Sequence, residues 1–484
     1  MASSCDIAWV RRASFISHSN TCFFPSTSAW RLLLWPSEEL SDMKNFDTVI
    51  IGAGVSGLTV ARLLAQAGQR VVVLEARDRV GGRTWTERSG SFTCDRGASW
   101  IHGIDDNRLT AVVHDFGMRT VEFTVGSYQP DGRPIAYYDP AGKRLNDGAI
   151  REFADDVRNF DLHLAVSIDA SEVGSTYLEA IEATLARLVW EPDRAERVRE
   201  FLLHRSEEQY GVWAGDLDAH GLDDDIVDGD EVVFPDGFDQ LSANLAEGID
   251  VRLEHVVTRV ARSAGRATVS SNQGEFAASN VVVTVPIGVL KSGTLAFDPP
   301  LPEWLTSAIS GFEMNSFEKV FLRFPTRFWD KDVYAIRQQG DAGTWWHSWY
   351  DLTALDGVPT LLTFAAGPSA IETREWCDDR IVESVLQSLR GLYGERVVQP
   401  DQVLVTDWQS DPYSRGSYAY MKPGSTPGDH DLLATPVDGV LHFAGEATWT
   451  EDPATVTAAL RSGHRAAENI LGRKLQFREL ADPL

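Results

Sequence analysis

The chain has 484 residues and a formal net charge of −27, and 43% of its residues are hydrophobic. This length predicts a large binding core with a second domain, and the apolar content excludes a disordered chain. The charge argues against nucleic acid and anionic membrane surfaces as partners, and no apolar run reaches the roughly eighteen residues that span a bilayer.

Residues 1–43 differ in kind from the rest of the chain, because they are rich in Ser and carry almost no acid before Glu38. Their composition resembles a transit peptide but lacks the apolar core of a secretory signal. Met43 is a plausible alternative start. We therefore expect an N-terminal extension that is disordered or not native.

The next segment carries a dinucleotide-binding signature. Residues 47–52 predict a strand, residues 58–67 a helix and residues 70–74 a second strand, with Gly52, Gly54 and Gly57 in the turn between strand and helix. Such glycines let the backbone approach a pyrophosphate at the helix N-terminus, and Glu75 at the end of the second strand binds ribose hydroxyls. NAD and FAD both fit this pattern.

The continuation after Glu75 favours FAD. A second glycine pair, Gly81 and Gly82, is followed by Arg83, which can close over the pyrophosphate from the opposite side. This arrangement suits a permanently held FAD.

The remaining chain alternates between helical and extended patterns. Residues 121–234 predict mainly amphipathic helices, such as 177–188 and 195–204, and they end in an acid-rich stretch. Strands are predicted afterwards at residues 251–253, 256–260, 281–285, 319–324 and 360–364, with a turn at 272–274 and a helix at 380–392.

We expect an α/β fold, α+β overall, with two discontinuous domains. The first is a Rossmann-like FAD-binding domain from residues 44–120, 235–300 and 405–475. The second is a substrate-binding domain of mixed sheet and helices from residues 121–234 and 301–404.

The four cysteines, Cys5, Cys22, Cys94 and Cys377, include no CxxC pair and no Cys/His cluster. Neither a disulfide framework nor a metal site is expected from them. This usage fits a reducing cytosol, so we expect a cytoplasmic protein, although the N-terminal extension leaves organelle targeting open.

Seven segments give the chain a family resemblance: VIIGAGVSGL, VLEARDRVGGRT, GASWIHG, VTVPIGVLK, EKVFLRFPTRFW, VTDWQSDPYSRGSYAY and HFAGEATWTEDPATVTAALRSG. In this order they resemble the flavin-containing amine oxidases, most closely the polyamine oxidase and lysine-specific demethylase branch. The resemblance covers residues 46–472. It departs from many relatives at Thr457 and Ala458, where those carry His and Gly.

The resemblance implies a set of FAD contacts and a helix that begins near Pro453 and points its N–H groups at the flavin. With the glycine signature, the implied cofactor-binding residues are Gly52, Gly54, Ser56, Gly57, Glu75, Arg77, Gly82, Arg83, Ser99, Trp100, Val257, Trp408, Glu446, Thr455 and Val456. The position at which monoamine oxidases tether the flavin through cysteine is Ser417 here, so noncovalent FAD is expected.

The resemblance also implies the residues that act on substrate. Lys319 matches the family lysine that holds a water against flavin N5, although a surface lysine on an edge strand is an alternative. His102, Tyr418 and Thr455 match substrate contacts. Core packing explains a lone aromatic residue equally well, and a structural role explains His102 equally well.

The expected activity is oxidation of polyamines of the spermine and spermidine class, as in polyamine catabolism. A hydride would pass to the flavin, O2 would become hydrogen peroxide, and the imine would hydrolyse to aldehyde and amine. Partners would be a small amine and O2, without nucleic acid or membrane, and the oligomeric state stays open. A monoamine oxidase, a protein-lysine demethylase and a redox-inactive flavin scaffold are the alternatives.

Overall fold

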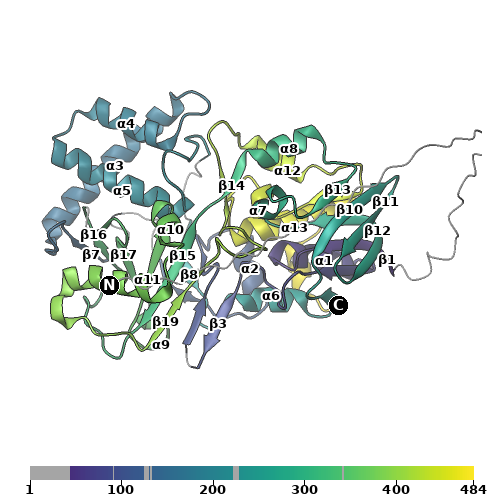
Figure 1. Ribbon diagram of the computed structural model, residues 1–484, viewed down its shortest axis with the longest axis horizontal. Coiled ribbons are helices and arrows are strands. Elements are labelled where there is room, and N and C mark those ends of the chain that lie inside the picture. The colour runs from purple at the N-terminus through teal and green to yellow at the C-terminus, as the bar shows by residue number, and fades with distance from the viewer. Residues whose placement is uncertain (1–43, 91, 125–129, 131–132, 222–227, 341–342) are drawn as a thin grey trace, which may run out of the picture. The chain divides into compact units, whose positions relative to one another are not determined.

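The structure is a computed structural model that describes residues 44–90, 92–124, 130, 133–221, 228–340 and 343–484. The predicted extension 1–43 lies outside the described residues. The described chain mixes α-helices with several β-sheets, as the sequence predicts (Figure 1).

The largest sheet has eight strands, and its centre is parallel. β1 (Lys44–Ile51) lies between β2 (Val71–Leu74) and β12 (Gly274–Val283) and runs parallel to both. β9 (Val251–Arg252) extends the sheet beyond β2, and β21 (Leu441–Phe443) pairs parallel with β12. Strands from opposite ends of the chain therefore form one sheet.

Beyond β12 the sheet continues through two antiparallel pairings, first to β11 (Arg266–Ser271) and then to β10 (Val257–Ser263). The edge strand β13 (Ala296–Asp298) pairs parallel with β10.

Helices bury the parallel strands. Val49 and Ile50 of β1 are fully buried, as a continuous apolar run in a covered parallel strand predicts. α1 (Val55–Gln66) packs against α13 (Val456–Leu471), where a Cβ added at Gly463 would lie 2.4 Å from the carbonyl oxygen of Ser56. The two helices that border the glycine turn and the FAGEAT segment are thus in close contact.

The second large sheet has six strands in the order β19-β15-β18-β17-β16-β7. Only the pairing of β16 with β7 is parallel. Its strands are β7 (Ile135–Tyr138), β15 (Phe317–Arg323), β16 (Ala335–Gln338), β17 (Ser348–Asp351), β18 (Thr360–Ala366) and β19 (Gln402–Val405).

Three helices pack beside the β7 edge of this sheet (Figure 1). They are α3 (Asp147–Asp169), α4 (Tyr177–Leu188) and α5 (Pro192–Tyr210). Tyr137 of β7 packs edge-on against Phe153 of α3, with ring centroids 5.4 Å apart. At the C-terminal end of α5, Glu208 accepts the hydroxyl of Tyr350 in β17, so this end of the helix contacts the sheet.

The remaining elements connect these layers. The short strands are β3 (Thr86–Ser89), β4 (Phe92–Asp95), β5 (Trp100–Ile101), β6 (Val121–Glu122), β8 (Val232–Val233), β14 (Phe312–Met314) and β20 (Ala419–Met421). The other α-helices are α2 (Arg108–Asp115), α6 (Asp239–Ala246), α7 (Ile287–Lys291), α8 (Glu303–Ser310), α9 (Thr353–Asp356), α10 (Pro368–Thr373), α11 (Asp378–Tyr393) and α12 (Gly428–Ala434). Short 3-10 helices lie at Gly394–Arg396, Glu446–Thr448 and Phe477–Ala481.

Most predicted elements are present, and three differ. The mainly helical block 121–234 also contains β7, which joins the six-stranded sheet. The predicted half-buried strand at 319–324 is buried on both faces, because Val320 and Leu322 pack in one cluster with α11 and Phe321 packs against Phe92 of β4 in another. The helix expected near Pro453 begins at Val456, because Thr455 caps it.

Two further sequence expectations concern cysteines and membranes. Cys94 and Cys377 are free thiols, whereas Cys5 and Cys22 lie outside the described residues. Among the helices of the described chain, none has the length and apolar character needed to cross a bilayer.

Candidate active site

A cavity of about 640 Å³ extends from the glycine turn of the large sheet to β15 and β18 of the six-stranded sheet. All predicted site residues line it except Gly57. The lining set is Gly52, Gly54, Ser56, Glu75, Arg77, Gly82, Arg83, Ser99, Trp100, His102, Val257, Lys319, Trp408, Tyr418, Glu446, Thr455 and Val456.

The three glycines of the turn have different structural roles. Gly52 has φ +105°, a left-handed conformation that favours glycine. A Cβ at Gly54 would meet no described atom within 4 Å, so its backbone is open to the cavity. A Cβ at Gly57 would lie 2.1 Å from the carbonyl oxygen of Gly52, so Gly57 permits close packing of α1 on β1. This explains why Gly57 does not line the cavity.

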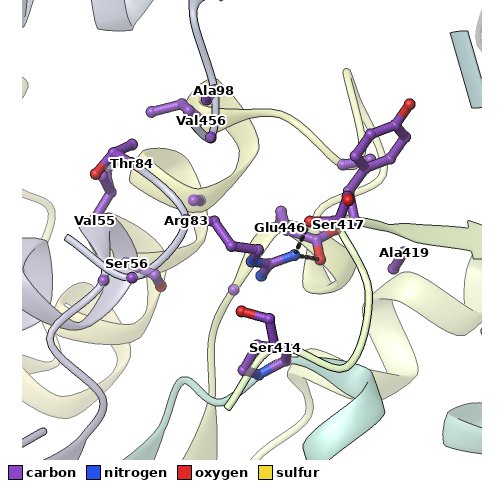
Figure 2. A pocket seen from close by; sticks show the side chains of 18 of the residues that line it. Val55, Ser56, Arg83, Thr84, Ala98, Ser414, Ser417, Ala419, Glu446 and Val456 are labelled. Carbon is purple, nitrogen blue, oxygen red and sulfur yellow. Dashed lines mark hydrogen bonds and ion pairs between the residues drawn. The ribbon is translucent and has the colours of Figure 1, made fainter. Parts of the chain in front are cut away.

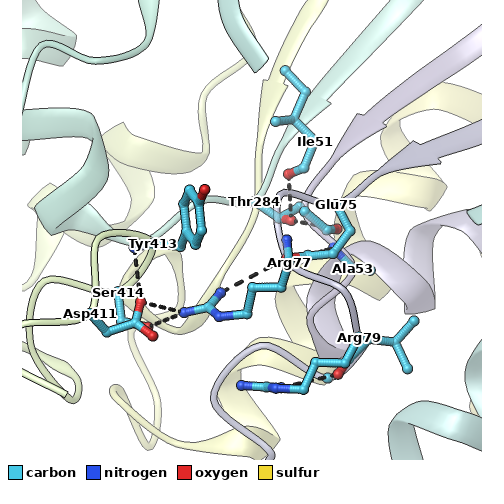
Figure 3. A network of polar contacts seen from close by, with 12 residues as sticks. Ile51, Ala53, Glu75, Arg77, Arg79, Thr284, Asp411, Tyr413 and Ser414 are labelled. Atoms are coloured by element: carbon cyan, nitrogen blue, oxygen red, sulfur yellow. Dashed lines mark hydrogen bonds and ion pairs between the residues drawn. The ribbon is translucent and has the colours of Figure 1, made fainter. Parts of the chain in front are cut away.

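Glu75 and Arg77 organise the end of β2 (Figure 3). The buried carboxylate of Glu75 accepts the backbone N–H groups of Ala53 at 2.7 Å and Arg77 at 2.9 Å. The Arg77 guanidinium donates to Asp411 at 2.6 Å and to Ser414 at 3.0 Å. These contacts join the glycine turn to the segment VTDWQSDPYSRG near the cavity.

Glu446 and Arg83 meet on another wall of the cavity (Figure 2). Arg83 Nη1 donates to Glu446 Oε1 at 2.8 Å and to the carbonyl oxygen of Ser417 at 3.1 Å. Glu446 Oε2 is buried and has no hydrogen-bond partner among the described residues. A buried acceptor without a partner is costly, so this oxygen fits the hydroxyl groups of a bound FAD.

Thr455 is the N-cap of α13. Its hydroxyl oxygen accepts the backbone N–H of Ala458 at 3.0 Å and donates to the carbonyl oxygen of Asp452 at 2.7 Å. Val456 follows on the cavity wall. Since capping occupies the Thr455 hydroxyl, this residue presents mainly a methyl group and backbone to a ligand.

Lys319 is buried in β15, only 6% exposed, so the alternative of a surface lysine on an edge strand is wrong. Its ammonium group donates to the carbonyl oxygens of Asp95 at 3.1 Å and Gly97 at 2.5 Å, and to the hydroxyl of Ser99. Burial lowers the pKa of Lys319 to about 8, although Asp95 partly offsets this. The lysine is therefore poised to exchange a proton near neutral pH.

Aromatic side chains line the cavity beside Lys319. Trp408 donates its indole N–H to the carbonyl oxygen of Arg96 at 2.9 Å and packs edge-on against Trp85. Tyr418 donates its hydroxyl to the carbonyl oxygen of Gln209 at 3.1 Å, and burial raises its pKa. Both rings are thus held in fixed orientations.

His102 stands half-exposed at the cavity wall, with a side chain 50% accessible. Its Nδ1 contacts the fully buried carboxylate of Glu231, and its ring stacks on Trp100 with centroids 6.5 Å apart. The histidine is oriented from within the protein and presents its other edge outward.

Glu208 also lines the cavity and was not predicted. Its side chain is 6% exposed, and it accepts the hydroxyl of Tyr350 at 2.5 Å. Burial raises its pKa, but His347, Arg337 and Tyr350 outweigh this, so the net pKa lies below the usual value. Glu208 lies in the last turn of α5, where the negative end of the helix dipole disfavours a carboxylate. An acid at such an unfavourable position was the available sequence signal.

Comparisons with known proteins identify the family to which the chain belongs. The family described as "Flavin containing amine oxidoreductase" matches residues 55–471. "Probable polyamine oxidase 4" of Arabidopsis thaliana is 31% identical over 431 residues, which cover 87% of this chain and 86% of that protein.

Two further relatives differ in their described activity. "Lysine-specific histone demethylase 1 homolog 1" of Oryza sativa subsp. japonica is 33% identical over 87% of this chain and 52% of its own length. A solved putrescine oxidase with redesigned cofactor binding is 25% identical, has a TM-score of 0.73, and matches 89% of this chain and 100% of its own.

Proposed function

Because this chain belongs to the flavin-containing amine oxidoreductase family, we propose that it is a polyamine oxidase acting on the spermine and spermidine class. The observation that carries the polyamine assignment is the buried Glu208 carboxylate, which lines the same cavity as Lys319. A carboxylate with a lowered pKa stays ionised at neutral pH.

Polyamines carry several amino groups, and only the one being oxidised has to be neutral. The remaining groups are cations, and an ionised carboxylate on the cavity wall offers one of them a partner. A simple monoamine has no second cation, so it leaves Glu208 without this partner. The chain charge of −27 acts in the same direction by attracting cations.

We assign noncovalent FAD to the end of the cavity that carries the glycine turn. Glu75 and Arg83 would hold the ribose and pyrophosphate regions, and Glu446 would accept a hydroxyl through its unpartnered oxygen. Ser417 stands where a tethering cysteine would be required. Bound FAD supplies the oxidising chemistry, taking a hydride from the carbon beside the amine and delivering electrons to O2 as hydrogen peroxide.

The proposed architecture assigns the cofactor to a Rossmann-like domain formed by residues 44–120, 235–300 and 405–475. The parallel unit β1-α1-β2 supports this assignment. Residues 121–234 and 301–404 would form the substrate-binding domain, and the pairing of β7 with β16 supports grouping these two segments.

The chain's own residues would orient and dehydrate the amine. The rings of Trp408 and Tyr418 exclude water and favour the neutral amine, the form that can lose a hydride. Lys319 would hold a water near the flavin and move protons, because its pKa of about 8 allows both charge states near neutral pH. His102 would make a polar contact with substrate, and Thr455 a contact through its methyl group.

A protein-lysine demethylase is the second candidate, favoured by the 33% identity to the rice demethylase homolog. The rest of a lysine-bearing peptide would then occupy the cavity in place of a polyamine. This candidate predicts flavin reduction by a methylated peptide and none by free spermidine.

Anaerobic mixing of the purified FAD-loaded protein with single amines tests these assignments. Spermine, spermidine, putrescine, benzylamine and a methylated lysine peptide are compared by the loss of flavin absorbance at about 450 nm. Rapid bleaching by spermine or spermidine, with peroxide on admission of air, supports the polyamine oxidase. Bleaching by another amine alone replaces the substrate, and bleaching by the peptide alone supports the demethylase.

A further inference from the structure

We propose that His347, stacked on His204, is a positioning residue that fixes the Glu208 carboxylate for the distal ammonium group of a polyamine. The inference rests on the proposed function and concerns residues behind the cavity wall. His204 and Glu208 lie on α5, and His347 immediately precedes β17.

The first step is the hold on both oxygens of Glu208. His347 Nε2 lies 2.8 Å from Oε1, and the hydroxyl of Tyr350 donates to Oε2 at 2.5 Å. The side chains of His347 and Glu208 are only 5% and 6% exposed. The hydrogen bond from Tyr350 and the close approach of His347, both from one short segment of chain, restrict rotation of this carboxylate.

The second step is the stack of the two histidines. The rings of His204 and His347 lie 3.8 Å apart with an interplanar angle of 20°. His204 Nδ1 is 3.2 Å from Glu207, and its Nε2 is 3.6 Å from Glu200. Two carboxylates thus flank His204, whereas His347 contacts Glu208.

The third step is the distribution of charge. Burial lowers the pKa of His204, but Glu200 and Glu207 outweigh this and raise it to about 9, so His204 is a cation at neutral pH. Burial and the neighbouring His204 charge lower the pKa of His347, against the opposing effect of Glu208 and Glu207. His347 is therefore neutral.

A neutral His347 matters for the substrate. If it carried a charge, His347 and Glu208 would form a buried ion pair and neutralise each other. The stacked cation of His204 opposes that second charge, so His347 orients the Glu208 carboxylate without cancelling it. Arg337 is a second cation whose charge lowers the pKa of Glu208, and its guanidinium also donates to the hydroxyl of Tyr137.

A metal ion is a less suitable occupant of this cluster. His204, Glu207 and His347 bring ligand atoms within 4.8 Å of one another. Imidazole binds metals in the plane of its ring, and an ion between two nearly parallel rings would lie outside both planes. The stack therefore favours a positioning role.

The test compares His347→Leu, which lacks a donor, with His347→Gln, whose amide nitrogen replaces Nε2. We expect His347→Leu to raise the KM for spermidine about tenfold and to leave kcat within about twofold, because it removes a contact to a charged group. The KM for benzylamine should not change. His347→Gln should restore most of the spermidine affinity.

His442→Leu is the matched control, since His442 is buried in β21 and does not line the cavity. This substitution should leave the ratio of the KM for spermidine to the KM for benzylamine unchanged. In His347→Leu the acidic limb of the spermidine kcat/KM profile should move to higher pH, because Glu208 loses a contact that lowers its pKa.

The possible failures are distinguishable. A wild-type enzyme that does not oxidise spermidine overturns the proposed function. A wild type that oxidises spermidine, with His347→Leu changing both KM values equally or neither, overturns this inference alone. Loss of the spermidine preference on treatment of the wild type with a chelator also overturns it, because a bound metal would then hold the cluster.

Discussion

The ammonium group of Lys319 lies 2.5 Å from the carbonyl oxygen of Gly97, which ties β15 of the six-stranded sheet to the loop between β4 and β5. Among the described residues, the three hydrogen bonds of this ammonium group all go to oxygens that carry no formal charge. Without a contacting carboxylate, burial dominates and lowers the pKa of the lysine.

Replacing Lys319 with methionine should slow amine oxidation. The variant keeps the volume of the side chain and removes the group that would hold water and move protons, so we expect a loss of about 100-fold in the rate of turnover. FAD content, measured by absorbance, should be retained. A variant with full FAD and wild-type turnover would contradict the role given to Lys319.

The same substitution should reveal a pH-dependent stability. Between about pH 8 and 10.5 the unfolded chain keeps a proton on Lys319 that the folded chain has released. The free energy of unfolding of the wild type should therefore rise with pH in this window relative to Lys319→Met, by up to about 3 kcal/mol. Denaturant unfolding at pH 7 and pH 9.5 measures it, and a constant difference would contradict the buried ammonium.

Gly54 and Gly57 allow a matched pair of alanine substitutions in one turn. Gly57→Ala should destabilise the protein by about 1–3 kcal/mol, because the new Cβ would lie 2.1 Å from the carbonyl oxygen of Gly52. In Gly54→Ala the new Cβ would have no described atom within 4 Å, so this variant should fold with near wild-type stability. It should nevertheless bind FAD weakly, because the methyl group stands where the pyrophosphate approaches.

Thermal unfolding of the FAD-free proteins, followed by titration with FAD, separates the two effects. Equal destabilisation by both substitutions would contradict the assignment of Gly57 to packing and of Gly54 to the cofactor-facing side of the turn.

Glu446→Gln should weaken FAD binding by about tenfold, because a neutral amide replaces the carboxylate whose buried Oε2 has no described partner. It also removes the charge that faces Arg83 at 2.8 Å. The exposed Glu372 provides the control, since Glu372→Gln should not change affinity. Quenching of flavin fluorescence measures both variants, and equal affinities would remove Glu446 from the cofactor site.

The cofactor end of this cavity was predictable from sequence because its chemistry is local. Gly52, Gly54 and Glu75 lie on one strand-turn-helix-strand unit, so their spacing fixes their geometry. The role of Lys319 was predicted only through the family resemblance. The alternation of residues around it predicts a half-buried strand, whereas the structure buries the strand completely. Burial on both faces depends on packing with α11 and β4, which no local pattern specifies.

The position of Glu208 on the cavity wall could not be predicted from a local sequence pattern. Its place on the cavity wall depends on β17, from which Tyr350 reaches the end of α5. That contact joins residues 142 positions apart, and the helix by itself shows only two adjacent acids in its last turn. The substrate end of the site therefore arises from tertiary packing.

Glu208→Gln should change the selectivity of the enzyme and preserve its chemistry. The amide keeps the size of the side chain and removes the negative charge, so the KM for spermidine should rise about 30-fold or more, as for loss of one partner of a buried charge pair. The KM for benzylamine should stay within about twofold, because a monoamine has no distal cation.

The pH dependence gives an independent measurement of the same group. His347, Arg337 and Tyr350 hold the pKa of Glu208 below its usual value against the effect of burial. In the wild type, kcat/KM for spermidine should therefore lose the contribution of this carboxylate only at a pH below the ordinary titration range of glutamate. Glu208→Gln should lack that step, and a step of unchanged size in the variant would assign the titration to another group.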